Sequence, residues 1–154
     1  MTNITIRPPD PTELDTLVEV VAQGIEESQL DVELDYQAAR DFLWLYINDG
    51  ETSVLVADQD GDIVGGVMLA EAKEFFIKPL CYVCKFWVLP KGRRTTAARQ
   101  LLQAVKEWAS DRQCSHIFVT ATADLDAREQ RLFINLMKRG GFTADGPVLR
   151  LTME

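Results

Sequence analysis

The segment from Cys81 to Leu102, CYVCKFWVLPKGRRTTAARQLL, constrains the fold of this chain more than any other stretch. It begins with an apolar run, Cys81 to Leu89, that is rich in aromatic and β-branched residues, which predicts a buried strand. Pro90 ends this strand, because proline lacks the amide donor of a strand residue. The short basic turn Lys91-Gly92-Arg93-Arg94 follows.

A helix is predicted directly after this basic turn. Thr95 or Thr96 supplies its N-cap, and apolar residues then recur at helical spacing. These apolar residues are Ala98, Leu101, Leu102, Val105 and Trp108. The free amides of a first helical turn and the helix dipole attract anions, and arginine side chains pair with phosphate oxygens. The segment therefore predicts an anion site, the alternative being a basic surface loop without a ligand.

The same residues resemble motif A of the GNAT superfamily of N-acetyltransferases. In that motif a strand ending in V-x-P precedes the pattern R/Q-x-x-G-x-G/A and a helix. Val88-Leu89-Pro90 matches the strand end, and Arg93 and Ala98 take the first and last positions of the pattern. Thr96 stands where the family usually has glycine, and Arg94 where a second glycine is common. The threonine side chain narrows the approach to the backbone, although its hydroxyl can donate a hydrogen bond.

Length and composition predict one soluble domain over residues 1–154. Hydrophobic residues make up 47% of the chain, and no apolar run approaches the roughly 20 residues that span a bilayer. The N-terminus lacks the layout of a signal peptide, and three cysteines, an odd number, fit a reducing compartment. We therefore expect a cytoplasmic protein without a membrane partner.

The net charge of −8 argues against nucleic acid as a partner. The charge is also unevenly distributed. Nine acidic residues and no lysine or arginine lie between Pro8 and Ala39, and fourteen of the sixteen basic residues lie at or beyond Lys73. Such asymmetry is expected where a cationic amine meets an anionic cofactor, although solvated helix faces give the same pattern.

A metal site is not expected. His116 is the only histidine, which excludes a histidine cluster. Cys81 and Cys84 form a C-x-x-C pattern, but an offset of three residues on a strand places them on opposite faces. Both are therefore interpreted as small core residues.

Hydrophobic periodicity and turn residues predict the remaining elements. In chain order these are a strand at Asn3–Arg7, a helix that starts at Asp10-Pro11, an acidic link at Glu26–Asp35, a helix at Tyr36–Asn48, a hairpin of strands Ser53–Ala57 and Ile63–Leu69, the central strand and a helix ending near Arg112, a strand at Ser115–Ala121, a helix at Asp126–Arg139 and a last strand at Pro147–Met153. The order β-α-α-β-β-β-α-β-α-β resembles the GNAT fold. That resemblance implies an α/β (mixed α+β) domain with a twisted mixed sheet of about six or seven strands and helices on both faces.

The resemblance implies transfer of an acetyl group from acetyl-CoA to a primary amine by direct attack in a ternary complex. The acceptor is a small molecule, a peptide N-terminus or a lysine, and a homodimer is left open as the assembly. The implied cofactor contacts are the backbone of Trp87 and Val88 for pantetheine, the residues Arg93, Arg94, Thr95, Thr96, Ala97 and Ala98 for the phosphates, and Asn135 as a further contact from the late helix. The alternative for Asn135 is an exposed helix amide without a ligand.

The segment Leu132 to Phe142 resembles motif B of the same family, a helix followed by Y-x-K-x-GF. Arg139, Gly141 and Phe142 match the ending of this motif. Met137 stands where many members carry a tyrosine that protonates the departing thiolate. A thioether has no proton to donate, so thiolate protonation falls to water or to the incoming amine.

A base for the amine is implied at two positions of the central strand, Tyr82 and Cys84. A phenol and a thiol titrate near 10 and 8.5, so neither suits the role at neutral pH. Both side chains are expected to share a strand face with Phe86, which gives plain packing as the alternative. An acetyl-Cys84 intermediate lacks an adjacent base in the sequence.

Deprotonation through water is the favoured route, with acidic residues of the link nearby as binders of the amine. These candidate substrate-binding residues are Glu26, Glu27, Asp31 and Glu33, which the resemblance places at the acceptor side of the cleft, away from the phosphates. Two other functions stay open: a GNAT-fold protein that binds coenzyme A or a regulatory partner without catalysis, and an interaction module whose acidic first half is the docking face. Neither a P-loop nor a dinucleotide-binding glycine motif occurs.

Overall fold

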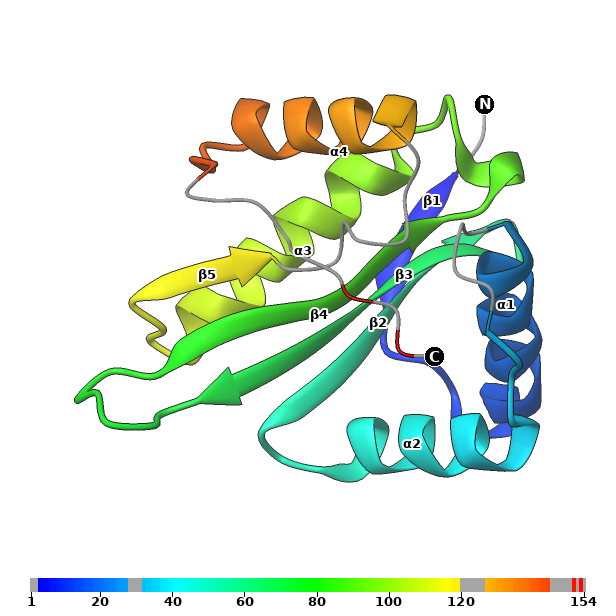
Figure 1. Ribbon diagram of the computed structural model, residues 1–154, viewed down its shortest axis with the longest axis horizontal. Coiled ribbons are helices and arrows are strands. Elements are labelled where there is room, and N and C mark those ends of the chain that lie inside the picture. The colour runs from blue at the N-terminus through cyan, green and yellow to red at the C-terminus, as the bar shows by residue number, and fades with distance from the viewer. Residues whose placement is uncertain (1–2, 28–31, 120–126, 145–150, 152, 154) are drawn as a thin grey trace.

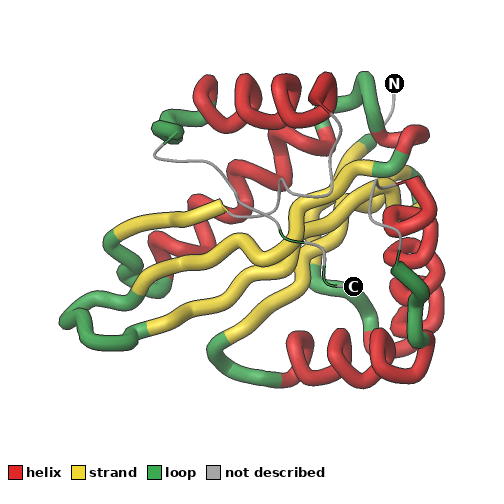
Figure 2. The backbone as a smooth tube through the Cα atoms, viewed as in Figure 1, coloured by secondary structure: helices red, strands yellow, loops and turns green. Residues whose placement is uncertain are grey.

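The computed structural model describes residues 3–27, 32–119, 127–144, 151 and 153 (Figures 1 and 2). Its elements are β1 (Ile4–Arg7), a 3-10 turn (Pro11–Glu13), α1 (Leu14–Glu27), α2 (Tyr36–Asn48), β2 (Thr52–Gln59), β3 (Asp62–Ala72), β4 (Leu80–Val88), a second 3-10 turn (Pro90–Gly92), α3 (Ala97–Asp111), β5 (His116–Val119) and α4 (Ala127–Arg139). Helix α2 has the predicted bounds, and the other elements differ from prediction by a few residues at their ends. The predicted last strand falls largely outside the described residues.

The described strands form one mixed sheet in the order β1-β2-β3-β4-β5. Strands β1 to β4 pair with one another in antiparallel fashion, and β5 runs parallel to β4. A parallel pair needs a crossover, which α3 provides. The expectation of a mixed GNAT-like sheet is confirmed, with five strands in the described part of the chain rather than six or seven.

Helices cover both faces of the sheet, as predicted (Figure 1). On one face, Leu101 and Val105 of α3 pack in a fully buried cluster with strand residues such as Val83. On the other face, α1 and α2 supply a second buried cluster that includes Leu17 and Leu43. Because α3 lies on one face of the sheet and α1 and α2 lie on the other, a side chain of β4 packs either in the cluster under α3 or in the cluster under α1 and α2.

The start of α1 is fixed by a capping box and an ion cluster. The Asp10 side chain accepts the Thr12 amide at 2.9 Å, and the Glu13 side chain accepts the Asp10 amide at 2.7 Å. Arg7 donates two bonds to Glu13, at 2.7 and 2.9 Å, and one to Asp58 of β2 at 3.1 Å. The Arg7 guanidinium lowers the pKa of Glu13. Strand β1, the first 3-10 turn and β2 are therefore tied together where α1 begins.

A β-bulge interrupts β4 at Cys84. Met68 of β3 pairs with Lys85, whereas the next residue, Leu69, pairs with Val83. One residue of β4 is therefore extra, and an extra residue reverses the alternation of side chains beyond it.

The bulge decides which face each residue of β4 occupies. Cys81 belongs to the cluster on the α3 face and Cys84 packs against the cluster under α1 and α2, so the prediction that they lie on opposite faces is confirmed. Phe86 packs on the α3 face and forms an edge contact with Phe133 of α4 at 5.6 Å between ring centroids. The prediction that Cys84 shares a face with Phe86 is therefore wrong, because strict alternation fails at a bulge.

Candidate active site

The basic loop joins β4 to α3 through the 3-10 turn Pro90–Gly92. The Gly92 amide donates to the Leu89 carbonyl at 2.8 Å, and the Thr95 hydroxyl donates to the Gly92 carbonyl at 2.5 Å. The same hydroxyl accepts the Ala97 amide at 3.1 Å. Of the two predicted capping residues, Thr95 is the one whose side chain caps the helix.

Thr96 lies at the helix boundary, with no capping bond from its side chain. Its carbonyl accepts the Gln100 amide at 2.9 Å, and its hydroxyl pairs with the Gln100 side-chain amide at 2.7 Å. The first turn of a helix has amides without an intrahelical partner. With Ala97 and Gln100 bonded, Ala98 and Arg99 are the amides that this turn offers to an anion, aided by the helix dipole.

Arg94 adopts a positive φ of 69°. This left-handed conformation crowds the Cβ atom of an ordinary residue, whereas glycine adopts it freely. The position is the one where the related motif commonly has glycine. The backbone at Arg94 thus has the conformation of a glycine-containing loop, and the Arg94 side chain adds a positive charge.

Replacing Arg94 with glycine is expected to relieve this crowding. Because Arg94→Ala loses the same charge but retains a Cβ atom, the two variants form a matched pair. We expect Arg94→Gly to be more stable than Arg94→Ala by about 1 kcal/mol. Urea unfolding of both variants measures the difference, and equal free energies of unfolding would mean that the loop does not hold residue 94 in this conformation.

Arg93 extends toward α1 and is half exposed. Its guanidinium lies 3.3 Å from the Glu27 carboxylate and donates to the Val88 carbonyl, also at 3.3 Å. Glu27 thus lies against the basic loop. The resemblance implied a position at the acceptor side of the cleft, away from this loop. An anion that binds at this loop competes with Glu27 for Arg93.

Strand β4 has an open edge next to the basic loop. Its ladder with β5 runs from Leu80–His116 to Val83–Val119, and β4 continues from Cys84 to Val88 beyond it. Within the described residues, only β3 pairs with that continuation. Trp87 and Val88 lie in it, where the resemblance implies backbone contacts to a pantetheine arm. A ligand with amide groups can add to such an edge as a strand does.

The two predicted base positions are both engaged. Tyr46 of α2 donates its hydroxyl to the Cys84 sulfur at 3.1 Å. Burial raises the pKa of Tyr46 to about 12, with a further contribution from Cys84, so its hydroxyl stays protonated. The Tyr82 hydroxyl donates to Glu74 at 3.2 Å, and desolvation and this carboxylate raise the pKa of Tyr82. Neither contact prepares a base for neutral pH. Tyr46 was not among the predicted site residues, because no sequence motif links it to Cys84.

A small cavity of about 190 Å³ lies between α1, α2 and the bulged part of β4. Its lining residues are Val20, Val21, Gly24, Ile25, Ala39, Phe42, Leu43, Met68, Lys85, Phe86 and Trp87. Lys85 is the charged member of this lining. Lys85 was not predicted as a site residue, because its position on this face depends on the bulge. The buried indole N–H of Trp87 has no hydrogen-bond partner within the described residues.

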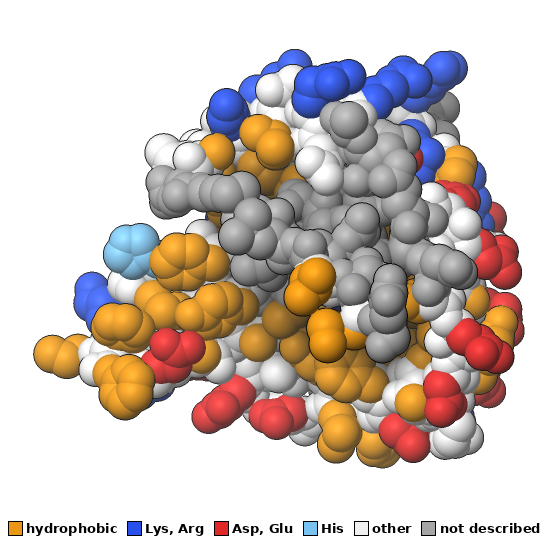
Figure 3. Space-filling view, viewed as in Figure 1, with side chains coloured by type: hydrophobic (Ala, Val, Ile, Leu, Met, Phe, Trp, Pro, Cys, Tyr) orange, Lys and Arg blue, Asp and Glu red, His pale blue; other side chains and the backbone are white. Residues whose placement is uncertain are grey.

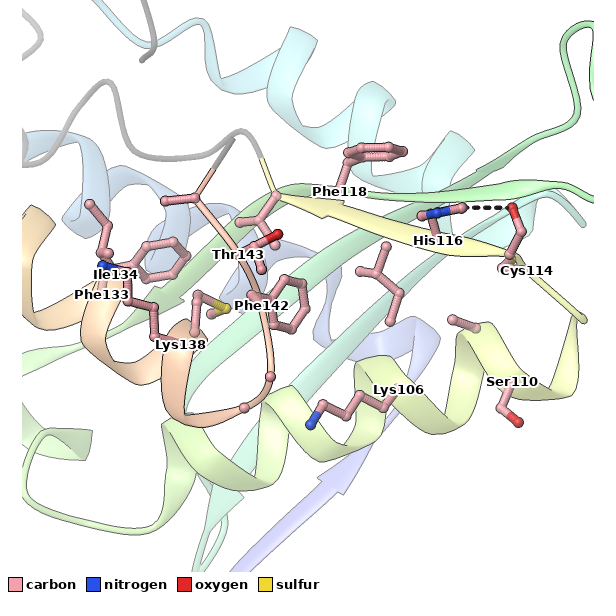
Figure 4. Close-up of a pocket in the computed structure, with 18 residues that line it drawn as sticks. Lys106, Ser110, Cys114, His116, Phe118, Phe133, Ile134, Lys138, Phe142 and Thr143 are labelled. Atoms are coloured by element: carbon pink, nitrogen blue, oxygen red, sulfur yellow. Dashed lines mark hydrogen bonds between the residues drawn. The ribbon is translucent and has the colours of Figure 1, made fainter. Parts of the chain in front are cut away.

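A larger groove of about 680 Å³ lies between α3, β5 and α4 (Figure 4). Lys106 of α3 and Lys138 of α4 are among its lining residues, together with the rings of Phe133 and Phe142. Met137, at the position of the family tyrosine, is buried and also lines this groove.

The remaining predicted residues are solvent-exposed or undescribed. Asn135 is exposed on α4 and lines neither of the two cavities. Glu26 and Glu33 are exposed near the acidic link, and Asp31 lies outside the described residues. Figure 3 shows lysine and arginine side chains gathered over α4 and acidic side chains over the side of α1, so the charge asymmetry of the sequence is also an asymmetry of the surface.

Family models decide the relationship of this chain to known proteins. The model described as the acetyltransferase (GNAT) family matches residues 18–136. The chain belongs to the GNAT family. The match includes β4, the basic loop and most of α4, so both cavities of this GNAT domain fall largely within it. No curated protein matches the chain.

Solved structures share the GNAT fold over nearly the whole chain. A transcriptional regulator from Bacillus halodurans C-125 has a TM-score of 0.78 at 19% identity, covering 98% of this chain and 100% of its own. The aminoglycoside N-acetyltransferase AAC(6')-Iy in complex with CoA has a TM-score of 0.75 at 18% identity, covering 99% and 96%. An aminoglycoside acetyltransferase from an uncultured soil metagenomic sample, in complex with sisomicin, has a TM-score of 0.72 at 18% identity, covering 98% and 95%. At these identities the likeness concerns the fold alone.

Among the helices of the described residues, none combines the length and the apolar character that a membrane span requires.

Proposed function

We propose that this GNAT domain transfers an acetyl group from acetyl-CoA to a primary amine by direct attack in a ternary complex. The observation that carries the proposal is the open edge of β4 leading directly into the basic loop at the start of α3. Acetyl-CoA has a pantetheine arm with two amides and a pyrophosphate at the end of that arm. The edge and the loop offer partners for these two parts in the same order. A solved relative with CoA bound supports the proposal.

The cofactor contacts follow from this arrangement. Pantetheine amides pair with the backbone of Trp87 and Val88, and the pyrophosphate accepts from the amides of Ala98 and Arg99. Arg93 and Arg94 add charge-assisted bonds to phosphate oxygens. Arg93 then exchanges Glu27 for the pyrophosphate, because both anions compete for one guanidinium.

The chemical step needs a neutral amine. The amine nitrogen attacks the thioester carbon, the carbon–nitrogen bond forms, and the carbon–sulfur bond breaks as the coenzyme A thiolate leaves. The ammonium proton goes to water, since the raised pKa values of the Tyr82 and Tyr46 hydroxyls make both poor bases at neutral pH. The thiolate takes a proton from water or from the attacking amine. A nearby thiolate or phenolate is not required.

The acceptor arrives as an ammonium ion and meets the acidic end of α1 and the link that follows it. Glu26, Asp31 and Glu33 are the proposed binding residues, which attract the cation. We include a small molecule, a peptide N-terminus and a lysine as acceptor classes, and we assign the reaction to the cytoplasm, with a homodimer as an open assembly.

A second candidate function is binding of coenzyme A or of a regulatory partner without turnover. Thr96 and Met137 favour it, because each replaces a residue type that the family uses for phosphate binding or for thiolate protonation.

The deciding experiment combines binding with turnover. Calorimetry measures acetyl-CoA binding, and release of free thiol in the presence of a panel of primary amines measures transfer. We expect binding and amine-dependent thiol release, with N-acetylated product identified by mass spectrometry. Binding without product from any amine would favour coenzyme A binding without turnover. Absence of acetyl-CoA binding would contradict the proposed transfer and leave only binding of a regulatory partner.

A further inference from the structure

The small cavity between α1, α2 and the bulged part of β4 is apolar on nearly every wall. Val21 and Ile25 of α1, Phe42 of α2 and Met68 of β3 supply hydrocarbon, aromatic and thioether surface. Its volume of about 190 Å³ is small beside ligand pockets, which are typically about 300–1,000 Å³. The cavity therefore suits one apolar side group of a ligand rather than a whole large molecule.

Lys85 gives this cavity a positive edge. The bulge pairs Lys85 with Met68, so both residues project from the same face of the sheet, toward α1 and α2. Lys85 is solvent-exposed, so its ammonium group is available to a ligand. A cation beside an apolar cavity disfavours a ligand with several positive charges and favours an anionic group next to an apolar one.

We propose that the acceptor of this domain is an amine that also carries a carboxylate and an apolar side group, as an apolar α-amino acid does. The side group fills the cavity and the carboxylate pairs with Lys85. This inference rests on the proposed function for the reaction itself, but the binding site is independent of turnover. It narrows the acceptor from any primary amine to one chemical class.

The position of Lys85 also affects deprotonation of the acceptor's ammonium group. A positive charge near an ammonium group disfavours its charged form and so lowers its pKa. Lys85 would thus assist loss of the acceptor's proton at a site where Tyr82 and Cys84 provide no base. The acidic residues at the end of α1 have the opposite effect on the amine, and so they serve capture rather than chemistry.

Gly24 offers a way to fill the cavity without disturbing the fold. It lies within α1, lines the cavity, and has nothing within 4 Å of the position that a Cβ atom would occupy. Leucine is also a better helix former than glycine. Gly24→Leu is therefore expected to fold and to occupy the space that the ligand's side group needs.

The test measures binding of matched ligands to the full chain in the presence of CoA, by NMR titration. L-leucine is compared with isoamylamine, and L-phenylalanine with phenethylamine, since each amine lacks only the carboxylate. Spermidine serves as a polycation. We expect each amino acid to bind at least about tenfold more tightly than its amine partner, and more tightly than spermidine.

Three variants assign this preference to the cavity. Lys85→Met keeps the unbranched stem of the side chain without its ammonium group and should bring each amino acid and its amine to equal affinity. Lys78→Met, at an exposed lysine of the β3–β4 connection, should leave the preference unchanged. Gly24→Leu should weaken both members of each pair. Thermal unfolding confirms that the variants are folded.

The outcomes separate this inference from the proposed function. Equal affinity of amino acid and amine in the natural chain, tighter spermidine binding, or no binding of any ligand would overturn the inference, whether or not amines are acetylated. A preference that persists in Lys85→Met would overturn it too. Selective binding without acetylated product would leave the inference standing and would contradict the proposed reaction.

Discussion

Replacing both Arg93 and Arg94 with alanine is expected to weaken acetyl-CoA binding by about 3 kcal/mol, or roughly a hundredfold. Each arginine is expected to make one charge-assisted bond to a phosphate oxygen, worth about 1.5–3 kcal/mol, and we take the lower value because Arg93 is half exposed. The backbone amides of the helix start remain in the variant, so binding should be weakened rather than abolished. Isothermal titration calorimetry measures the change.

Two controls assign this loss to the loop. Lys73→Ala with Lys78→Ala removes the same charge from the exposed β3–β4 connection and should leave the affinity unchanged. Glu27→Gln removes the carboxylate that contacts Arg93 at 3.3 Å and should strengthen binding by a few-fold. Unchanged affinity in the double alanine variant would contradict phosphate binding at this loop.

The order of elements was predictable because each carries a strong local signal. The hairpin of β2 and β3 is indicated by an apolar run on either side of Asp60-Gly61, and Gly61 adopts a φ of 97° as such a turn requires. The basic loop was likewise predictable from Pro90 and the threonines that follow. These signals lie within a few residues of the structure that they specify.

The chemistry of β4 was not predictable in the same way. Its bulge at Cys84 depends on pairing with β3, which is a contact between distant parts of the chain. Strict alternation places Cys84 on the face of Phe86, an expectation that fails at the bulge. It would also place Lys85 on the α3 face with Cys81 and Val83, whereas Lys85 lines the cavity between α1, α2 and β4. The hydrogen-bond partner of Cys84 is Tyr46, 38 residues away on α2. In the sequence pattern, Tyr46 is one more apolar residue of the predicted helix.

The basic loop depends on a glycine for a reason that the sequence motif does not show. A Cβ atom at Gly92 would lie 2.8 Å from the Val64 carbonyl oxygen, 2.9 Å from the Val64 Cβ atom and 3.0 Å from a methyl group of Val88. Two of these three atoms are fixed by the backbone of β3. The turn therefore lies so close to β3 that only a hydrogen atom fits between them, although Gly92 has an ordinary backbone conformation.

Gly92→Ala is accordingly expected to destabilise the fold by about 1–3 kcal/mol, the usual cost of inserting a methyl group into a packed site. Urea unfolding measures this change. Gly50→Ala is the matched control, because nothing lies within 4 Å of its Cβ position, and its stability should stay within about 0.5 kcal/mol of the natural chain.

The same substitution tests whether the loop must hold its position to bind the cofactor. The turn can relieve the contact only by moving away from β3, and Arg93 and the helix start would move with it, because the Gly92 carbonyl holds the Thr95 hydroxyl that caps α3. Gly92→Ala should therefore weaken acetyl-CoA binding while every charge of the loop is retained. Calorimetry on folded Gly92→Ala protein that gave the natural affinity would show that charge alone, and not the placement of these donors, determines binding.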